Sequence, residues 1–94
     1  MHERIIESKL TRATKAMGGL ALKFISPGYD GVPDRIVLFP SGRIAFVEVK
    51  APGEKPRPLQ LSRHRLLRRL GFRVYVLDAA EQIGGILDEI ESQL

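Results

Sequence analysis

The stretch GVPDRIVLFPSGRIAFVEVK, residues 31–50, decides the fold because it has the pattern of a β-hairpin. Two runs rich in branched apolar residues, 34–39 and 43–50, flank the tripeptide Pro-Ser-Gly at 40–42. This tripeptide suits a three-residue loop in which proline and serine form a type I turn and the glycine is left-handed. We therefore predict two neighbouring antiparallel strands.

The short loop also fixes the register of the hairpin, because it pairs Phe39 with Arg43. Counting outward, the facing pairs on one side of the sheet are Leu38 with Ile44, Ile36 with Phe46, and Asp34 with Glu48. Lys50 lies on that side too, two residues beyond Glu48. We expect large apolar side chains along this side and, at its end, two carboxylates and a lysine.

The remaining elements are predicted from hydrophobic spacing and from glycine and proline. Helices are expected over 2–17, 59–70 and 79–93, strands over 20–26 and 73–78, and loops over 26–33 and 51–58. The order α-β-β-β-α-β-α indicates an α/β fold, a mixed β-sheet flanked by helices. The crossover after the hairpin favours a last strand parallel to its neighbour.

Two helices raise questions of packing. In the helix 59–70, we expect Leu59, Leu66, Leu67 and Leu70 on or near one face and arginines on the other. The apolar stripe of the last helix consists of Ile83, Ile86, Leu87 and Ile90. This stripe could pack on the sheet or on a partner chain, and the sequence leaves both possibilities open.

The size and composition of the chain limit its function. With 94 residues, 44% hydrophobic and 28% charged, we expect one globular domain over 1–94. No apolar run is long enough for a transmembrane helix or resembles a signal segment. The absence of cysteine excludes disulfides, thiolate metal sites and a cysteine nucleophile, and it fits a reducing cytoplasm.

The charge of the chain is unevenly distributed. The net charge is +4, and ten of the fifteen cationic residues are arginine, which suits bidentate contacts with phosphate. Eight of the fifteen lie between Lys50 and Arg73, where Glu54 is the sole acid. This imbalance favours a polyanionic partner. The alternative interpretation is a solvated basic face of a helix.

The end of the hairpin is the candidate site. Asp34 and Glu48 facing each other repel, and a divalent cation such as Mg²⁺ would offset that repulsion. The carbonyl of Val49 could supply a further oxygen, and Lys50 could orient a metal-bound water or help to deprotonate it. The alternative for Glu48 and Lys50 is a strand-end ion pair of small energetic value. Three charged residues in an otherwise apolar hairpin favour the site.

Other kinds of site find little support. His2 and His64 lack partners at metal-ligand spacing, so we expect both at the surface. No serine has the context of a nucleophile elbow. No P-loop and no GxGxxG motif is present.

Several short motifs together resemble one nuclease family. They are SPG at 26–28, GVPDR at 31–35, EVK followed by APG at 48–53, PLQ at 58–60 and GFRVYV at 71–76. In this order they cover nearly the whole chain. They are similar to the PD-(D/E)xK nuclease superfamily, and most closely to its VRR-NUC family in the short stand-alone form from phages and bacteria. The pattern P-D…E-x-K alone is weak, whereas the full string is specific.

The resemblance implies a fold, an activity and a partner. The fold would be restriction-endonuclease-like. The activity would be that of a Mg²⁺- or Mn²⁺-dependent deoxyribonuclease, hydrolysing phosphodiester bonds in branched DNA such as four-way junctions or flaps. Family members of this size resemble Holliday-junction resolvases, which implies a homodimer. The setting would be the cytoplasm of a bacterium or of a phage-infected cell.

The resemblance also implies roles for individual residues. Asp34 and Glu48 would bind the metal, and Lys50 would assist the attacking water. A glutamate of the first helix would join them. Glu3 and Glu7 are both available, and we prefer Glu7 because it borders the apolar stripe of that helix.

Further residues are candidates beside these. Gln60 resembles the helix glutamine that lies near the metal site in the superfamily. Phosphates of the DNA backbone would be held by Arg35, Lys55, Arg57, Arg63 and Arg65. Tyr29 would stack on a base or pack against the protein. Two rival interpretations remain: a non-catalytic nucleic-acid-binding module that uses the same basic face, and a structural or partner-binding domain.

Overall fold

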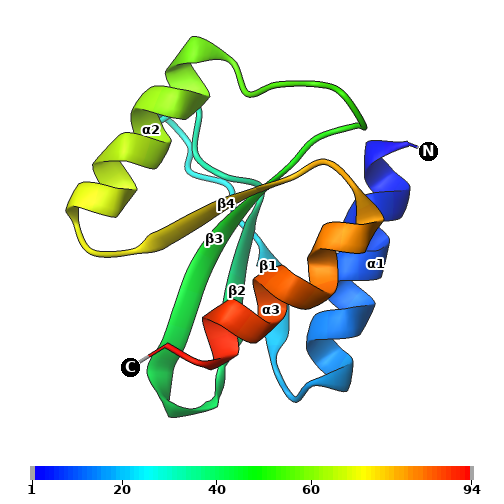
Figure 1. Cartoon of the computed structure of the whole chain (residues 1–94). Helices are drawn as coiled ribbons and strands as arrows, with labels where there is room; N and C mark the ends of the chain where they lie inside the picture. The colour runs from blue at the N-terminus through cyan, green and yellow to red at the C-terminus, as the bar shows by residue number, and fades with distance from the viewer. Residues whose placement is uncertain (1, 94) are drawn as a thin grey trace.

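The computed structural model describes residues 2–93, and the order of its elements is the predicted one. The elements are α1 (Glu3–Ala16), β1 (Leu20–Lys23), β2 (Arg35–Phe39), β3 (Arg43–Val49), α2 (Pro58–Arg69), β4 (Arg73–Leu77) and α3 (Ile83–Glu91) (Figure 1). Single turns of 3₁₀-helix lie at Pro40–Gly42 and Ala80–Gln82. Within this part of the chain, no helix is both long and apolar enough to cross a lipid bilayer.

The strands form a mixed sheet with the spatial order β1-β2-β3-β4. The pairs β1–β2 and β2–β3 are antiparallel, and β3–β4 is parallel, as the crossover predicts. The predicted hairpin register is confirmed, because Phe39 faces Arg43 and Ile36 faces Phe46. The predicted turn is wrong in one detail. Ser41 has a φ of 70° and a ψ of 26°, a left-handed conformation where the prediction placed a right-handed one.

Two helices cover one face of the sheet. In Figure 1, α1 and α3 lie on the same side of the strands, and α2 lies apart from them. Val37, Ala45, Val47 and Val49 project toward α1 and α3 and are fully buried in the main core. The core also includes the apolar stripe of α3 (Ile83, Ile86, Leu87 and Ile90). That stripe therefore packs on its own sheet, which answers the question that the sequence left open.

Three predicted elements differ from the observed ones. The first strand ends at Lys23 instead of residue 26, although the Phe24 amide still donates to the Asp34 carbonyl. The last helix begins only at Ile83, after a turn of 3₁₀-helix. In α2 the buried side chains are Gln60 and His64, whereas Leu59 is 45% exposed. The expected leucine face of α2 is therefore wrong, because this helix turns polar side chains toward the end of the sheet where Glu48 lies.

The second face of the sheet is apolar and only partly covered. Five side chains on it form cross-strand neighbours, and we call them the open apolar face: Leu20, Leu22, Ile36, Leu38 and Ile44. Leu20 is 53% exposed and Leu22 is 46% exposed, and the other three are half-buried. The ring of Phe46 packs beside them against Phe24 and Phe72, with centroids 5.6 Å apart in both pairs. Beyond Phe46 this face becomes polar.

Candidate metal centre

The polar end of the second sheet face brings Asp34 and Glu48 together. The hairpin ladder pairs Arg35 with Val47, so the next residues outward, Asp34 and Glu48, face each other. Because Asp34 follows the alternation of Ile36, and Glu48 that of Phe46, both side chains project toward α2. They are close enough for the charge of Glu48 to act on Asp34. The structure thus gives these two acids the arrangement that the register predicted.

Asp34 lies where its negative charge is poorly solvated. Its Oδ2 accepts a hydrogen bond of 2.8 Å from the Val49 amide. Burial raises the pKa of Asp34 to about 6, although the hydrogen bond from Val49 opposes the rise. The charge and hydrogen bond of Glu48 and the charge of Glu3 raise it further. Glu48 and Glu3 therefore both add to the negative charge around Asp34.

Glu48 is the most enclosed acid of the group, with a side chain only 1% exposed. Its Oε2 accepts a hydrogen bond of 3.0 Å from Gln60 Nε2 and lies 3.6 Å from Lys50 Nζ. Its Oε1 lies 3.4 Å from His64 Nε2. A buried carboxylate needs such partners, because burying an unpaired charge costs several kcal/mol, on the order of 3–5 when one partner is lost. The predicted site residues Lys50 and Gln60 thus both contact Glu48.

The position of Gln60 follows from the way α2 begins. Pro58 starts the helix, a position at which the missing proline amide costs nothing. Gln60, two residues later, accepts the Arg57 amide at Oε1 over 2.8 Å. This contact leaves the amide nitrogen of Gln60 pointing at Glu48, an orientation assigned from the hydrogen-bond network. The loop before α2 thereby fixes a side chain of the site.

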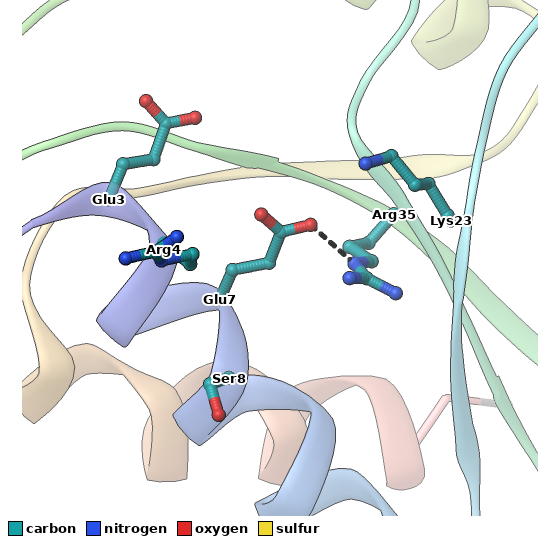
Figure 2. A pocket seen from close by; sticks show the side chains of 6 residues that line it. All are labelled: Glu3, Arg4, Glu7, Ser8, Lys23 and Arg35. Atoms are coloured by element: carbon teal, nitrogen blue, oxygen red, sulfur yellow. Dashed lines mark hydrogen bonds and ion pairs between the residues drawn. The ribbon is translucent and has the colours of Figure 1, made fainter.

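The two acids of α1 have different surroundings. Glu7 Oε2 accepts a hydrogen bond of 2.7 Å from Arg35 Nε, and the same guanidinium donates to the Ala21 carbonyl over 3.1 Å. Glu3, one turn earlier, is the α1 acid whose charge acts on Asp34. Both line an open cavity of about 580 Å³ together with Arg4, Ser8, Lys23 and Arg35. Figure 2 shows the ion pair from Glu7 to Arg35 and the Glu3 carboxylate standing apart from it.

A family model for the VRR-NUC domain matches residues 3–81. The chain belongs to the VRR-NUC family. It is 52% identical over 81 residues to "Putative nuclease p44" of Acyrthosiphon pisum secondary endosymbiont phage 1, an alignment that covers 86% of this chain and 87% of the phage protein. A solved structure described as a VRR_NUC domain superposes with a TM-score of 0.86 at 34% identity, covering 92% of this chain and 94% of the other.

The five residues of this VRR-NUC domain that are predicted to hold phosphates fall into two groups. Arg35 and Arg63 already have partners within the protein: Arg63 Nε donates to the Asp30 carbonyl over 2.8 Å, and its guanidinium lies 3.8 Å from the centroid of the Tyr29 ring. Lys55, Arg57 and Arg65 are exposed. The exposed group is therefore better placed than the engaged pair to contact phosphates.

One residue of the centre was missed by sequence reasoning. His64 is fully buried against Glu48, so its predicted surface position is wrong. The available signal was its spacing from Gln60, because residues four apart share a helix face. If the side chain of Gln60 points at Glu48, the side chain of His64 must lie on the same side of the helix and near the same carboxylate.

The donor set of this VRR-NUC domain fits a hard divalent cation. Among residues 2–93, no group of three or more His, Cys, Asp and Glu side chains is arranged to hold a metal ion. Mg²⁺ does not require such a group, because it binds through one or two carboxylates and keeps several waters. Asp34 and Glu48 offer such a pair, and a cation bound between them would offset their mutual repulsion. The lack of sulfur ligands disfavours softer metals.

Proposed function

We propose that this VRR-NUC domain is an endodeoxyribonuclease that depends on Mg²⁺ or Mn²⁺. The observation that carries the proposal is the facing pair Asp34 and Glu48 with Lys50 beside it, in a basic chain. The phage relative named as a nuclease supports the same class of activity. The proposed substrate is branched DNA, and the proposed setting is the cytoplasm of a bacterial or phage-infected cell.

The proposed reaction is hydrolysis of a phosphodiester bond. Asp34 and Glu48 would hold the cation, with the Val49 carbonyl as a further ligand, and the bound metal supplies Lewis-acid activation of phosphate and water. Lys50, whose Nζ lies 3.6 Å from Glu48 Oε2, would orient the attacking water. The water oxygen bonds to phosphorus, the bond to the 3′ oxygen breaks, and that oxygen takes up a proton. The products are a 5′-phosphate and a 3′-hydroxyl.

Of the two acids in α1, Glu3 is favoured as the additional metal ligand, because Glu7 is paired with Arg35 and the charge of Glu3 acts on Asp34. Glu7 is held by Arg35 at 2.7 Å, so its carboxylate is already neutralised. The charge of Glu3 reaches Asp34 without an ion pair of this kind. Glu7 would then keep Arg35 in place next to Asp34, where the guanidinium can face a phosphate from one side.

We further propose a homodimer that joins two copies through the open apolar face. Soluble monomers rarely leave a contiguous apolar patch uncovered. The five side chains of this face carry no charge, so a second copy of the chain can pack on it without burying a charged side chain. A symmetric pair of sites would also suit branched DNA, in which two equivalent strands are cut.

The oligomeric state tests this interface directly. We expect light scattering after size exclusion to give the mass of two chains for the wild type and of one chain for Leu22→Glu. Ile5→Glu is the matched control, because Ile5 is 44% exposed and lies on α1 at the other side of the sheet. A monomeric wild type would refute the interface.

The activity is tested by incubating the protein with four-way junction, flap, splayed-arm and linear duplex DNA, with Mn²⁺ or with EDTA. We expect cleavage only with the metal, and fastest on one of the branched substrates. Asp34→Ala and Glu48→Ala should abolish cleavage and retain DNA binding, whereas Asp88→Ala, an exposed acid of α3, should behave as the wild type. Metal-independent binding without any cleavage would favour the non-catalytic module instead.

A further inference from the structure

We propose that His64 is a positioning residue that holds the carboxylate of Glu48 in the orientation required for metal binding. This inference rests on the proposed function, because Glu48 is there a metal ligand. The imidazole is fully buried on the second turn of α2, and its Nε2 lies 3.4 Å from Glu48 Oε1. No other part of the mechanism above uses this side chain.

The cost of burying an imidazole argues against a role in packing alone. His64 Nδ1 is the one buried side-chain nitrogen or oxygen in residues 2–93 that has no hydrogen-bond partner. Unsatisfied buried polar atoms are rare in proteins, and an apolar side chain could occupy the same space without that penalty. The same helix leaves Leu59 and Leu61 exposed. The helix thus leaves apolar side chains in solvent and buries a histidine at its most enclosed position.

The pattern of contacts also indicates which tautomer is present. An unprotonated ring nitrogen tolerates the lack of a partner better than an N–H group, which would be an unsatisfied donor. A bare Nδ1 places the proton on Nε2, the nitrogen that faces Glu48. Nε2 of His64 then donates to Oε1 of Glu48.

Gln60 and His64, the two buried polar side chains of α2, contact different oxygens of the Glu48 carboxylate. Gln60 donates to Oε2 over 3.0 Å, and His64, one helical turn later, faces Oε1. Because Lys50 also faces Oε2, the second lone pair of Oε1 is the one that remains for a cation. Partners in this outer position orient metal ligands, and their loss typically weakens metal binding by about 10- to 100-fold. The carboxylate is thus preset for the metal before DNA arrives.

The test compares His64→Leu, which removes the donor, with His64→Gln, whose amide nitrogen can replace Nε2. Mn²⁺ binding is measured without DNA by electron paramagnetic resonance, and DNA cleavage is measured in parallel. We expect His64→Leu to bind Mn²⁺ about tenfold more weakly and to lose kcat at unchanged KM for DNA, while His64→Gln stays within about threefold of the wild type. His64→Met serves as the donor-free variant if His64→Leu does not fold, as judged by urea unfolding.

Each outcome assigns a role or removes one. Unchanged Mn²⁺ affinity in the donor-free variant would overturn the inference, and so would a His64→Gln protein as impaired as His64→Leu. A wild type that binds no Mn²⁺ would overturn the inference and the metal-dependent nuclease together. A wild type that binds Mn²⁺, with the expected weakening in His64→Leu, but cuts no DNA would overturn the nuclease alone.

Discussion

The two faces of the sheet differ in what their buried residues do. The face under α1 and α3 is apolar at its centre, where Val37, Ala45, Val47 and Val49 are fully buried. The opposite face is divided into an open apolar end and a polar end that encloses Glu48. Alternation along a strand permits this, because neighbouring residues such as Val47 and Glu48 enter different environments. One face therefore supplies stability, and the other carries the charge that a reaction requires.

The difference has an energetic consequence. Apolar burial contributes about 25 cal/mol for each Å² removed from water, and the first face collects most of it. The second face loses stability, because Asp34 and Glu48 repel each other across the hairpin. The protein can tolerate that loss as long as the first face is intact. Substitutions on the first face should therefore mainly lower the free energy of unfolding. Substitutions at the polar end of the second face should mainly lower the rate of DNA cleavage.

The largest effect is expected from Lys50→Ala, which changes the second face alone. We expect the cleavage rate to fall by about 10³-fold, because the ammonium group that faces Glu48 and the reacting water is lost. Mn²⁺ binding should stay close to that of the wild type, whereas the urea midpoint without metal should fall, because the buried Glu48 loses its cationic partner. Single-turnover cleavage with saturating Mn²⁺ measures the rate. A parallel loss of Mn²⁺ binding would contradict a role confined to the water.

The next largest effect is expected from a core leucine. Leu87→Ala should lower the free energy of unfolding by about 3 kcal/mol, because Leu87 of α3 is fully buried against the first face of the sheet. Leu22→Ala, at 46% exposure on the open apolar face, should cost less than about 1 kcal/mol in dilute protein. Urea unfolding at one low protein concentration compares the two. Equal losses would mean that the open apolar face is covered even in dilute solution.

How far the sequence reaches can be judged from the hairpin. The register of Phe39 with Arg43 was predictable, because a three-residue loop and alternating apolar residues both act over a few positions. That register alone set Asp34 opposite Glu48. The left-handed Ser41 was not predictable in the same way, because two turn types fit the same tripeptide.

The remaining contacts of the site depend on packing between distant segments. His64 is buried because the crossover lays α2 over Glu48, 16 residues earlier in the chain. Glu7 is taken up by Arg35, which lies 28 residues further along. Nothing in either local pattern states which residue will occupy the facing position. A sequence can therefore nominate the acids of such a site, and the arrangement of its helices assigns their partners.

A smaller effect is expected from pH in the absence of metal. The folded pKa of Asp34, about 6, exceeds its ordinary value of 3.8, so the fold prefers the protonated acid. The stability that Asp34 contributes is complete below about pH 4 and is lost as the pH rises through 6. We expect Asp34→Asn in EDTA to be more stable than the wild type by about 1 kcal/mol at pH 7.5, and this gain to shrink below pH 5. Urea unfolding at both pH values measures it, and Asp88→Asn should show no such gain.

The smallest effect is expected at the basic surface, where Arg65 and Arg63 form a matched pair on α2. Arg65 is exposed, so Arg65→Ala should weaken DNA binding about threefold and reduce the slope of log affinity against log salt by about 0.9. Arg63 instead clamps the loop before Asp34, through the Asp30 carbonyl and the Tyr29 ring. Arg63→Ala should therefore change the salt slope less and speed up hydrogen exchange in residues 28–31. Fluorescence anisotropy across a salt series, with exchange measured by mass spectrometry, separates the two. If both variants shift the salt slope equally, Arg63 leaves Tyr29 when DNA binds, and the clamp is not a fixed part of the second face.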